Sequence, residues 1–507
     1  MNPGGYEKFF LPSFVSMFIA LAFMSCALFV NVKDQSPLKR FYLVLLLGNG
    51  LLLIAQILIV RSTYYYTIWD PGTIMSFSEA VVTGSDTAGW AWYFNLFPNN
   101  ELLTIIMVRL TALSHAIGKS PTAVAAIVGA ILVNIGGLFS AISARRITKS
   151  NYVAICIWIL YSILASLSPW IAVPYSDTYS IVFVAGSILC LTFVFPFGSR
   201  RRTFFASAAF AACVLIGAQI KPTVTVVLIA ASLVLVVFLL TRYSRNLLKN
   251  VIPLCSGCVA TMLLCGFVLV PNTHAEMDSY YQANHDEAVS VTHYLMMGAN
   301  PDTFGSFSFD DYAISRSVEG YKERQSVNLS VYKDRMHSFG CAGYAAFLGR
   351  KLLFTYYDGD FGVGGEGNGL PPEEAYLPDN PWGNFSQLLR DVYYFAGEKP
   401  HLLVEIEQVS WFAMLVLMLI FSICFAFQKK LGEKADPVAV VLILSFLGVT
   451  AFLLLFETRS RYLYCFLPLF STIAALGIAY GRKAADGIKL RFSASLHHTA
   501  EQATSDD

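Results

Sequence analysis

The chain has 507 residues, of which 56% are hydrophobic and only 14% are charged. Soluble domains carry roughly 25% charged residues, because water-facing positions accept charges that lipid-facing positions do not. This composition, with a mean hydropathy of +0.57, excludes a soluble multi-domain protein and indicates an integral membrane protein. The formal net charge of +1 gives no reason to expect a nucleic-acid partner.

Apolar runs of roughly 17–25 residues, the length that crosses a bilayer as a helix, follow one another along the chain. A further run, 102–117, is shorter and carries Arg109 near its middle. Because a charge at the bilayer centre is costly, we expect this run to re-enter or to lie along the interface. The eleven runs expected to cross are 9–31, 41–61, 121–143, 151–168, 178–197, 203–220, 223–241, 251–271, 407–428, 437–456 and 462–480.

Lysine and arginine collect in short connections, which the positive-inside rule assigns to the cytoplasm. The two longest remaining segments, 62–101 and 272–406, then both lie outside, so an even number of crossings must separate them. That requirement is met if 102–117 does not cross, which predicts eleven crossings with the N-terminus outside and the C-terminus inside. The basic connections contain Lys33, Lys39 and Arg40; Arg145, Arg146 and Lys149; Arg200, Arg201 and Arg202; Arg242, Arg245 and Lys249; Lys429, Lys430 and Lys434; and the tail from Arg482.

The predicted fold class is an all-α polytopic membrane protein, with a bundle of about 11 transmembrane helices and a mixed outer domain. Within that outer domain the glycine-rich sequence Gly362–Gly369 predicts a mobile loop. The expected divisions are an N-terminal transmembrane module at 1–271 with its first outer loop at 62–101, a large extracytoplasmic domain at 272–406, C-terminal transmembrane helices at 407–482, and a partly disordered cytoplasmic tail at 483–507.

The first outer segment carries acids among aromatic residues. Asp70 follows Trp69 just beyond the end of a span, Glu79 lies nine residues later, and Tyr93 belongs to a further aromatic group. Aromatic residues commonly form a belt at the membrane interface, and Asp70 could simply begin a turn before Pro71. A partly desolvated carboxylate at this position is also a candidate general base.

Two more polar residues are expected at the same face. Asp177 opens a predicted span, where it could act as a helix N-cap. Lys221 lies in the turn between two spans, where it could extend toward the interface or bind an anion.

The turn between the last two spans reads FETRSRYLY and contains Glu457, Arg459, Arg461 and Tyr462. Basic residues on the outer side run against the positive-inside bias. An anionic ligand such as a lipid phosphate would account for them, and pairing with Glu457 is the alternative.

These residues together describe an outward-facing site with carboxylates, cations and aromatic rings. A carboxylate can activate a hydroxyl, a cation can hold a leaving phosphate, and an aromatic ring suits the face of a sugar. Glycosyl transfer from a lipid-linked phosphosugar needs these three functions. The outer location is consistent with such a donor, because nucleotide sugars are not present there.

The order of segments resembles the GT-C superfamily of membrane glycosyltransferases, which includes protein O-mannosyltransferases and aminoarabinose transferases. The resemblance extends over most of the chain, and the match is best to bacterial members that share several short motifs. The extra N-terminal span at 9–31 departs from the pattern. The motifs are an acid followed ten residues later by alanine (Asp70, Ala80), a YF-x-x-[YF]-PNN stretch (93–100), THYLMMG (292–298), KLLFTYYDGDF (351–361) and RSRY (459–462).

The resemblance implies inverting transfer from a polyprenyl-phosphate sugar, with Asp70 as the general base. We expect Arg459 and Arg461, with Lys221 and Arg109, to bind the carrier phosphate. Further residues expected at the donor or acceptor pocket are Tyr93, Asp177, His293, Glu79, Glu457 and Tyr462.

The expected partners are a polyprenyl-phosphate-linked sugar donor, membrane lipid, and an acceptor that is a glycan, a lipid or a protein. No cofactor or metal is indicated, although a divalent metal is compatible with the chemistry. We expect a multi-pass protein of the plasma membrane with an extracytoplasmic site.

Two other functions remain open from the sequence. One is a transporter or flippase of a lipid-linked sugar, and the other is a non-catalytic or polymerase-type protein of surface polysaccharide assembly. A separation of more than about 15 Å between Asp70 and Arg461 would argue against catalysis, because reacting groups must be close together.

Overall fold

The computed structural model describes residues 13–30, 37–195, 199–241, 245–363, 381–394, 397–428 and 436–505. Within these ranges the chain forms helices and connecting segments, and no β-strand occurs. Helices are the expected solution for a chain in lipid, because each helix satisfies its own backbone hydrogen bonds. The all-α prediction is confirmed, whereas the outer domain expected to be mixed is helical in its described part.

Nine helical segments in the described part of the chain are long and apolar enough to cross a membrane. Two shorter apolar helices, Ser13–Phe29 and Asn151–Ser166, correspond to the remaining runs predicted to cross. The helices concerned are α1 (Ser13–Phe29), α2 (Leu38–Thr63), α6 (Pro121–Thr148), α7 (Asn151–Tyr161), α8 (Ser176–Val194), α9 (Arg200–Ile220), α10 (Thr225–Thr241), α11 (Arg245–Leu264), α12 (Val270–Asp278), α17 (Pro400–Gln428), α18 (Pro437–Leu455) and α19 (Leu467–Ser505).

Small residues bring the central helices into close contact. A Cβ at Gly136 of α6 would lie 2.6 Å from the Tyr161 hydroxyl of α7, and that hydroxyl donates to the Val133 carbonyl at 2.9 Å. A Cβ at Gly477 of α19 would lie 2.0 Å from the Leu417 carbonyl of α17. Such small-residue contacts are the usual basis of helix packing in membranes.

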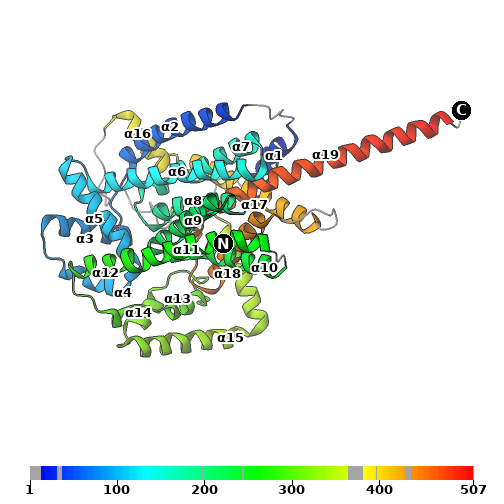
Figure 1. Cartoon of the computed structure of the whole chain (residues 1–507). Coiled ribbons are helices and arrows are strands. Elements are labelled where there is room, and N and C mark those ends of the chain that lie inside the picture. The colour runs from blue at the N-terminus through cyan, green and yellow to red at the C-terminus, as the bar shows by residue number, and fades with distance from the viewer. Residues whose placement is uncertain are drawn as a thin grey trace.

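The remaining helices belong to the segments predicted to lie outside, apart from α5, which covers the run predicted not to cross. In Figure 1, α3, α4, α5 and α12 lie together at one side of the bundle, and α19 leaves it on the opposite side. This separation agrees with the predicted division between an outer face and a cytoplasmic tail. These helices are α3 (Asp70–Thr83), α4 (Ala91–Leu96), α5 (Glu101–Ala116), α13 (Val291–Gly298), α14 (Phe309–Arg316), α15 (Tyr321–Tyr356) and α16 (Asn384–Tyr393).

Helix α5 covers the short run that was predicted not to cross. It is not among the segments long enough to span a membrane. It packs against α3 and α12, which belong to or adjoin the predicted outer segments, and also against the spanning helices α6 and α9. The packing of α5 is therefore consistent with a helix at the outer interface.

Two further expectations concern the outer loop and the tail. The glycine-rich sequence 362–369 lies outside the described residues beyond Val363. The tail was predicted to be partly disordered from its polarity, but α19 continues as a helix to Ser505. The physical reason is that adding a residue to a helix that has already formed costs less than starting a new helix.

Candidate functional site

The local sequence fixes Asp70 at the start of helix α3. Trp69 is the extended N-cap residue, and Pro71 occupies the first turn, where its fixed φ suits a helix start. Gly72 is required by packing, because a Cβ there would lie 1.7 Å from the Thr67 carbonyl oxygen. The Asp-Pro-Gly sequence therefore starts a helix, and the half-buried Asp70 lies at its positive end.

Two buried tyrosines adjoin the Asp70 carboxylate. The Tyr175 hydroxyl donates to Asp70 Oδ2 at 2.8 Å, and the Asn100 amide donates to the Tyr93 hydroxyl at 2.9 Å. Burial, and secondly the Asp70 carboxylate, hold the pKa of both Tyr93 and Tyr175 well above the ordinary value. Both phenols therefore stay protonated and can act as hydrogen-bond donors.

Arg461 lies among aromatic rings on the other side of Tyr175. Its guanidinium carbon is 4.4 Å from the Trp69 ring centre and 5.7 Å from the Tyr175 ring centre. It is also 5.9 Å from the Trp170 ring and 5.4 Å from the Tyr462 ring. These cation–π contacts hold the charge in a largely buried position.

Asp177 joins Arg461 to Lys221. One of its carboxylate oxygens is 2.5 Å from Lys221 Nζ, and the other is 3.4 Å from Arg461 Nε. The Asp177 side chain does not cap α8. Tyr175 occupies the N-cap position, and no side-chain capping hydrogen bond forms there. Asp177 instead compensates two buried cations that come from distant parts of the chain.

Glu457 and Tyr462 extend this group of charges. The Tyr462 hydroxyl donates to Glu457 Oε1 at 2.9 Å, and Arg459 Nε lies 3.5 Å from the same oxygen. Lys221 Nζ is 4.8 Å from the Tyr462 ring centre. We call the connected residues Asp70, Tyr175, Asp177, Lys221, Glu457, Arg459, Arg461 and Tyr462 the ionic cluster.

The ionic cluster brings the predicted base close to the predicted phosphate-binding arginine. Tyr175 contacts both, with its hydroxyl on Asp70 and its ring beside Arg461. One tyrosine side chain therefore separates Asp70 from Arg461. This separation is shorter than the distance of about 15 Å beyond which the two could not serve one reaction.

Two residues expected at the site lie elsewhere. Glu79 pairs with His115 of α5, with 2.8 Å between His115 Nε2 and Glu79 Oε1. At about 100° per residue, nine residues along α3 turn Glu79 to the face opposite Asp70. Arg109 pairs with Glu276 of α12 at 2.5 Å, and its side chain is 66% exposed. It therefore serves a surface ion pair of α5.

His293 belongs to the interior of the outer domain. Its Nδ1 lies 2.6 Å from the Ser315 hydroxyl, which donates to Asn328 at 2.9 Å. The next residue, Tyr294, is the one that faces the ionic cluster. Burial raises its pKa, and the carboxylates of Glu457 and Asp70 raise it further.

The sequence reasoning missed Tyr175, Trp170 and Tyr294 as site residues. Tyr175 precedes Asp177 in the stretch VPYSDTY, and Tyr294 follows His293 in THYLMMG. In both stretches a nearby residue, Asp177 or His293, was predicted at the site instead of the tyrosine. Position on a helix turn, rather than residue type, decides which side chain reaches the site.

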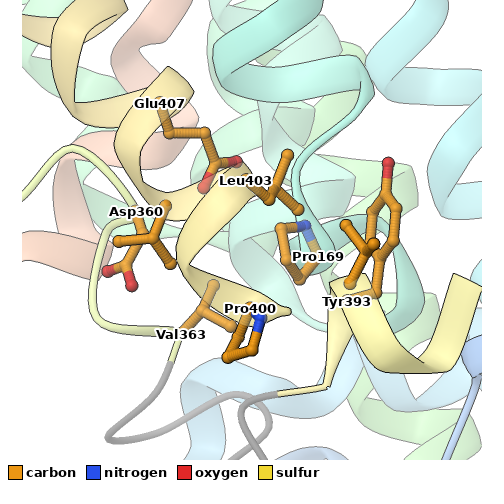
Figure 2. A pocket seen from close by; sticks show the side chains of 9 residues that line it. Pro169, Asp360, Val363, Tyr393, Pro400, Leu403 and Glu407 are labelled. Atoms are coloured by element: carbon orange, nitrogen blue, oxygen red, sulfur yellow. The ribbon is translucent and has the colours of Figure 1, made fainter. Parts of the chain in front are cut away.

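A small cavity adjoins the ionic cluster. Figure 2 shows Asp360 and Glu407 at this cavity, with Pro169 and Tyr393 on the opposite wall. Trp170 connects it to the ionic cluster, because its indole donates to the Asp360 carbonyl at 3.3 Å and its ring lies near Arg461. The acid Asp360 comes from the KLLFTYYDGDF motif, which offered the only sequence signal for this cavity.

Residues 9–481 match the sequence family described as CHIM_prot, conserved hypothetical integral membrane protein. The chain belongs to this family. The match covers nearly the whole chain and agrees with its apolar helices, while the description names no activity. Searches of curated proteins and of solved structures each found no match.

Proposed function

We propose that this integral membrane protein is an inverting glycosyltransferase that moves a sugar from a polyprenyl-phosphate carrier to an acceptor hydroxyl on the extracytoplasmic face. One observation carries the proposal. A half-buried carboxylate, Asp70, lies one tyrosine side chain away from Arg461. A base and a phosphate-binding cation at this separation suit a single transfer reaction.

In this reaction Asp70 accepts the proton of the acceptor hydroxyl while the oxygen attacks the anomeric carbon. A new C–O bond forms as the bond from the anomeric carbon to the phosphate oxygen breaks. Attack and departure occur on opposite sides of the carbon, so its configuration is inverted. The electron pair of the broken bond leaves with the polyprenyl phosphate, which needs positive charge nearby.

The cations of the ionic cluster suit that leaving group. Lys221 and Arg461 are held in place by Asp177, so their positions are set before a donor binds. Arg459 is the more accessible arginine, with a side chain 22% exposed against 8% for Arg461. We therefore assign the first contact with the lipid phosphate to Arg459, and stabilisation of the leaving phosphate to Arg461 and Lys221.

A transporter would need polar groups along a path through the membrane. Asn134 is a polar residue within the apolar helix α6. It donates to Gln56 Oε1 at 3.0 Å and to the Asn49 carbonyl at 3.3 Å. These bonds join α2 to α6, as interhelical hydrogen bonds commonly do. Asn134 therefore supports helix packing better than it supports transport.

The test is transfer by membranes that contain the Asp70→Asn variant. The membranes are supplied with radiolabelled polyprenyl-phosphate mannose, glucose or arabinose, and the label in surface glycans is measured. Loss of a general base is expected to lower the rate by roughly 10²–10⁴-fold. Glu79→Gln is the matched control, because this acid lies on the other face of α3 and should leave the rate unchanged. Transfer by Asp70→Asn at the wild-type rate would rule out Asp70 as the base.

A further inference from the structure

A band of aromatic residues connects the two ends of the ionic cluster across the outer domain. It begins at Arg459, whose guanidinium carbon lies 5.7 Å from the Phe307 ring centre. Phe307 lies 4.9 Å from Phe309 and 6.4 Å from Tyr312. We call Trp92, Phe307, Phe309, Tyr312 and Arg316 the aromatic band.

Arg316 contacts members of the band on both helix α14 and helix α4. Its guanidinium carbon lies 5.9 Å from the Tyr312 ring centre and 5.5 Å from the Trp92 ring centre. Trp92 in turn packs against Tyr93 at 5.8 Å, and Tyr93 adjoins Asp70. The aromatic band therefore starts beside the predicted phosphate-binding arginine and ends at Trp92, which Tyr93 separates from the predicted base.

The band is accessible and is held on a fixed support. Phe309 is 79% exposed and Trp92 is 44% exposed. Helix α14, which carries three members of the band, is anchored by the buried Asp311. The Asp311 carboxylate is 2.6 Å from Arg335 Nη2 and accepts from the Asn300 amide at 3.0 Å.

The surroundings of the band favour a polar occupant over lipid. Asp310 follows Phe309 directly and is exposed, and Arg316 lies between two of the rings. Placing both charges in hydrocarbon would be costly. A saccharide matches this surface, because its C–H faces pack on aromatic rings and its hydroxyls accept hydrogen bonds from a guanidinium.

We propose that the aromatic band binds the saccharide chain of the acceptor and leads its terminal hydroxyl toward Asp70. This inference rests on the proposed function and adds to it the chemical class of the acceptor, which is a glycan rather than a protein or a lipid. The continuity of the band with both ends of the ionic cluster is the observation that carries it.

The test measures binding without any sugar donor. Purified full-length protein in nanodiscs is titrated with linear hexasaccharides of mannose, glucose and galactose, and binding is followed by saturation-transfer NMR. We expect at least one hexasaccharide to bind, and Trp92→Ala and Phe309→Ala each to weaken binding by about tenfold. Tyr321→Ala is the matched control, because this exposed aromatic of α15 lies outside the band and should leave binding unchanged.

Three results would overturn the inference. They are absence of binding across the three hexasaccharides, wild-type affinity in both band variants, and quenching of Trp92 fluorescence by brominated phosphatidylcholine. The quenching is measured as the difference between wild type and Trp92→Phe. Asp70→Asn should keep hexasaccharide binding while it loses transfer. If Asp70→Asn instead transfers normally, the proposed base is wrong and the binding result still stands.

Discussion

A single buried carboxylate, Asp177, holds together three distant parts of the chain. It begins helix α8, and its partners Lys221 and Arg461 come from the end of α9 and from the turn before α19. Both cationic side chains are largely buried, at 9% exposed for Lys221 and 8% for Arg461. A buried charge without a partner is strongly destabilising, so Asp177 has a structural role whether or not it touches a substrate.

Asp177→Asn should therefore destabilise the protein markedly. The amide removes the negative charge that Lys221 and Arg461 share, and breaking a buried ion pair costs about 3 to 5 kcal/mol. The measurement is thermal unfolding of the purified protein in detergent, where we expect a clear fall in Tm. Asp177→Asn combined with Lys221→Gln should recover part of that loss, whereas Glu319→Gln at an exposed position should have little effect. An unchanged Tm in Asp177→Asn would contradict this role.

His293 gives the outer domain a sensitivity to acid. Burial lowers the pKa of this histidine to about 4. The Asp311 carboxylate opposes that shift, and the Arg324 guanidinium adds to it. The unfolded chain takes up a proton near pH 6.5, but the folded chain does not until about pH 4. Stability from this group is therefore present above pH 6.5 and is lost as the pH falls toward 4.

The corresponding variant is His293→Gln, which cannot titrate. We expect wild type to lose up to about 3 kcal/mol more stability than the variant between pH 7.5 and pH 4. Thermal unfolding of both proteins across this range measures the difference. Equal pH dependence in the two proteins would show that His293 does not cause the acid sensitivity.

At the scale of elements, Lys351 fastens the outer domain to the end of helix α18. This fully buried side chain donates from Nζ to the carbonyls of Gly298 and Phe456, each at 2.6 Å. Burial lowers its pKa to about 7, and the neighbouring Glu457 opposes that shift. Next to it, the Thr458 amide donates to the Gly305 carbonyl at 2.9 Å.

We expect Lys351→Met to loosen this attachment. The substitution keeps the bulk of the side chain but leaves two buried carbonyls unpaired, at a cost of about 1 to 3 kcal/mol. Hydrogen exchange of the peptide that contains 456–458 should become faster. Lys322→Met is the matched control on the exposed start of α15. In this variant the peptide that contains 456–458 should exchange at the wild-type rate. Unchanged protection of 456–458 in Lys351→Met would show that the attachment does not depend on this lysine.

At the scale of the whole molecule, the basic connections predict the orientation of the chain in the membrane. Cys341 offers a direct test, because it is exposed in α15 of the predicted outer domain. A membrane-impermeant maleimide should label it in right-side-out vesicles. The other exposed cysteines among the described residues, Cys26 and Cys255, lie in apolar helices, where a polar reagent does not reach.

The control removes that cysteine and places one on the opposite side. In a Cys341→Ser background, Ser199→Cys lies beside the arginines that begin α9. This position should react only in inverted vesicles. Labelling of Ser199→Cys in right-side-out vesicles would reverse the predicted orientation.

The sequence by itself determined the membrane class, the all-α fold and, within the described residues, the apolar runs that form helices. These properties depend on local composition, because a segment in lipid must be apolar over its whole length and must satisfy its own backbone. The start of α3 was not predicted, because Asp70 before Pro71 was interpreted as the possible beginning of a turn, whereas a helix begins there.

Only the tertiary structure decided which polar residues meet. Asp177 could cap its own helix in the sequence, but packing of α8 against α9 and the turn at 457–461 places it between two cations. Glu79 and Asp70 share a helix, yet the helix turn separates them. Helix rotation and long-range contacts are set by the packing of the entire bundle, so local sequence could name the candidate residues but not select among them.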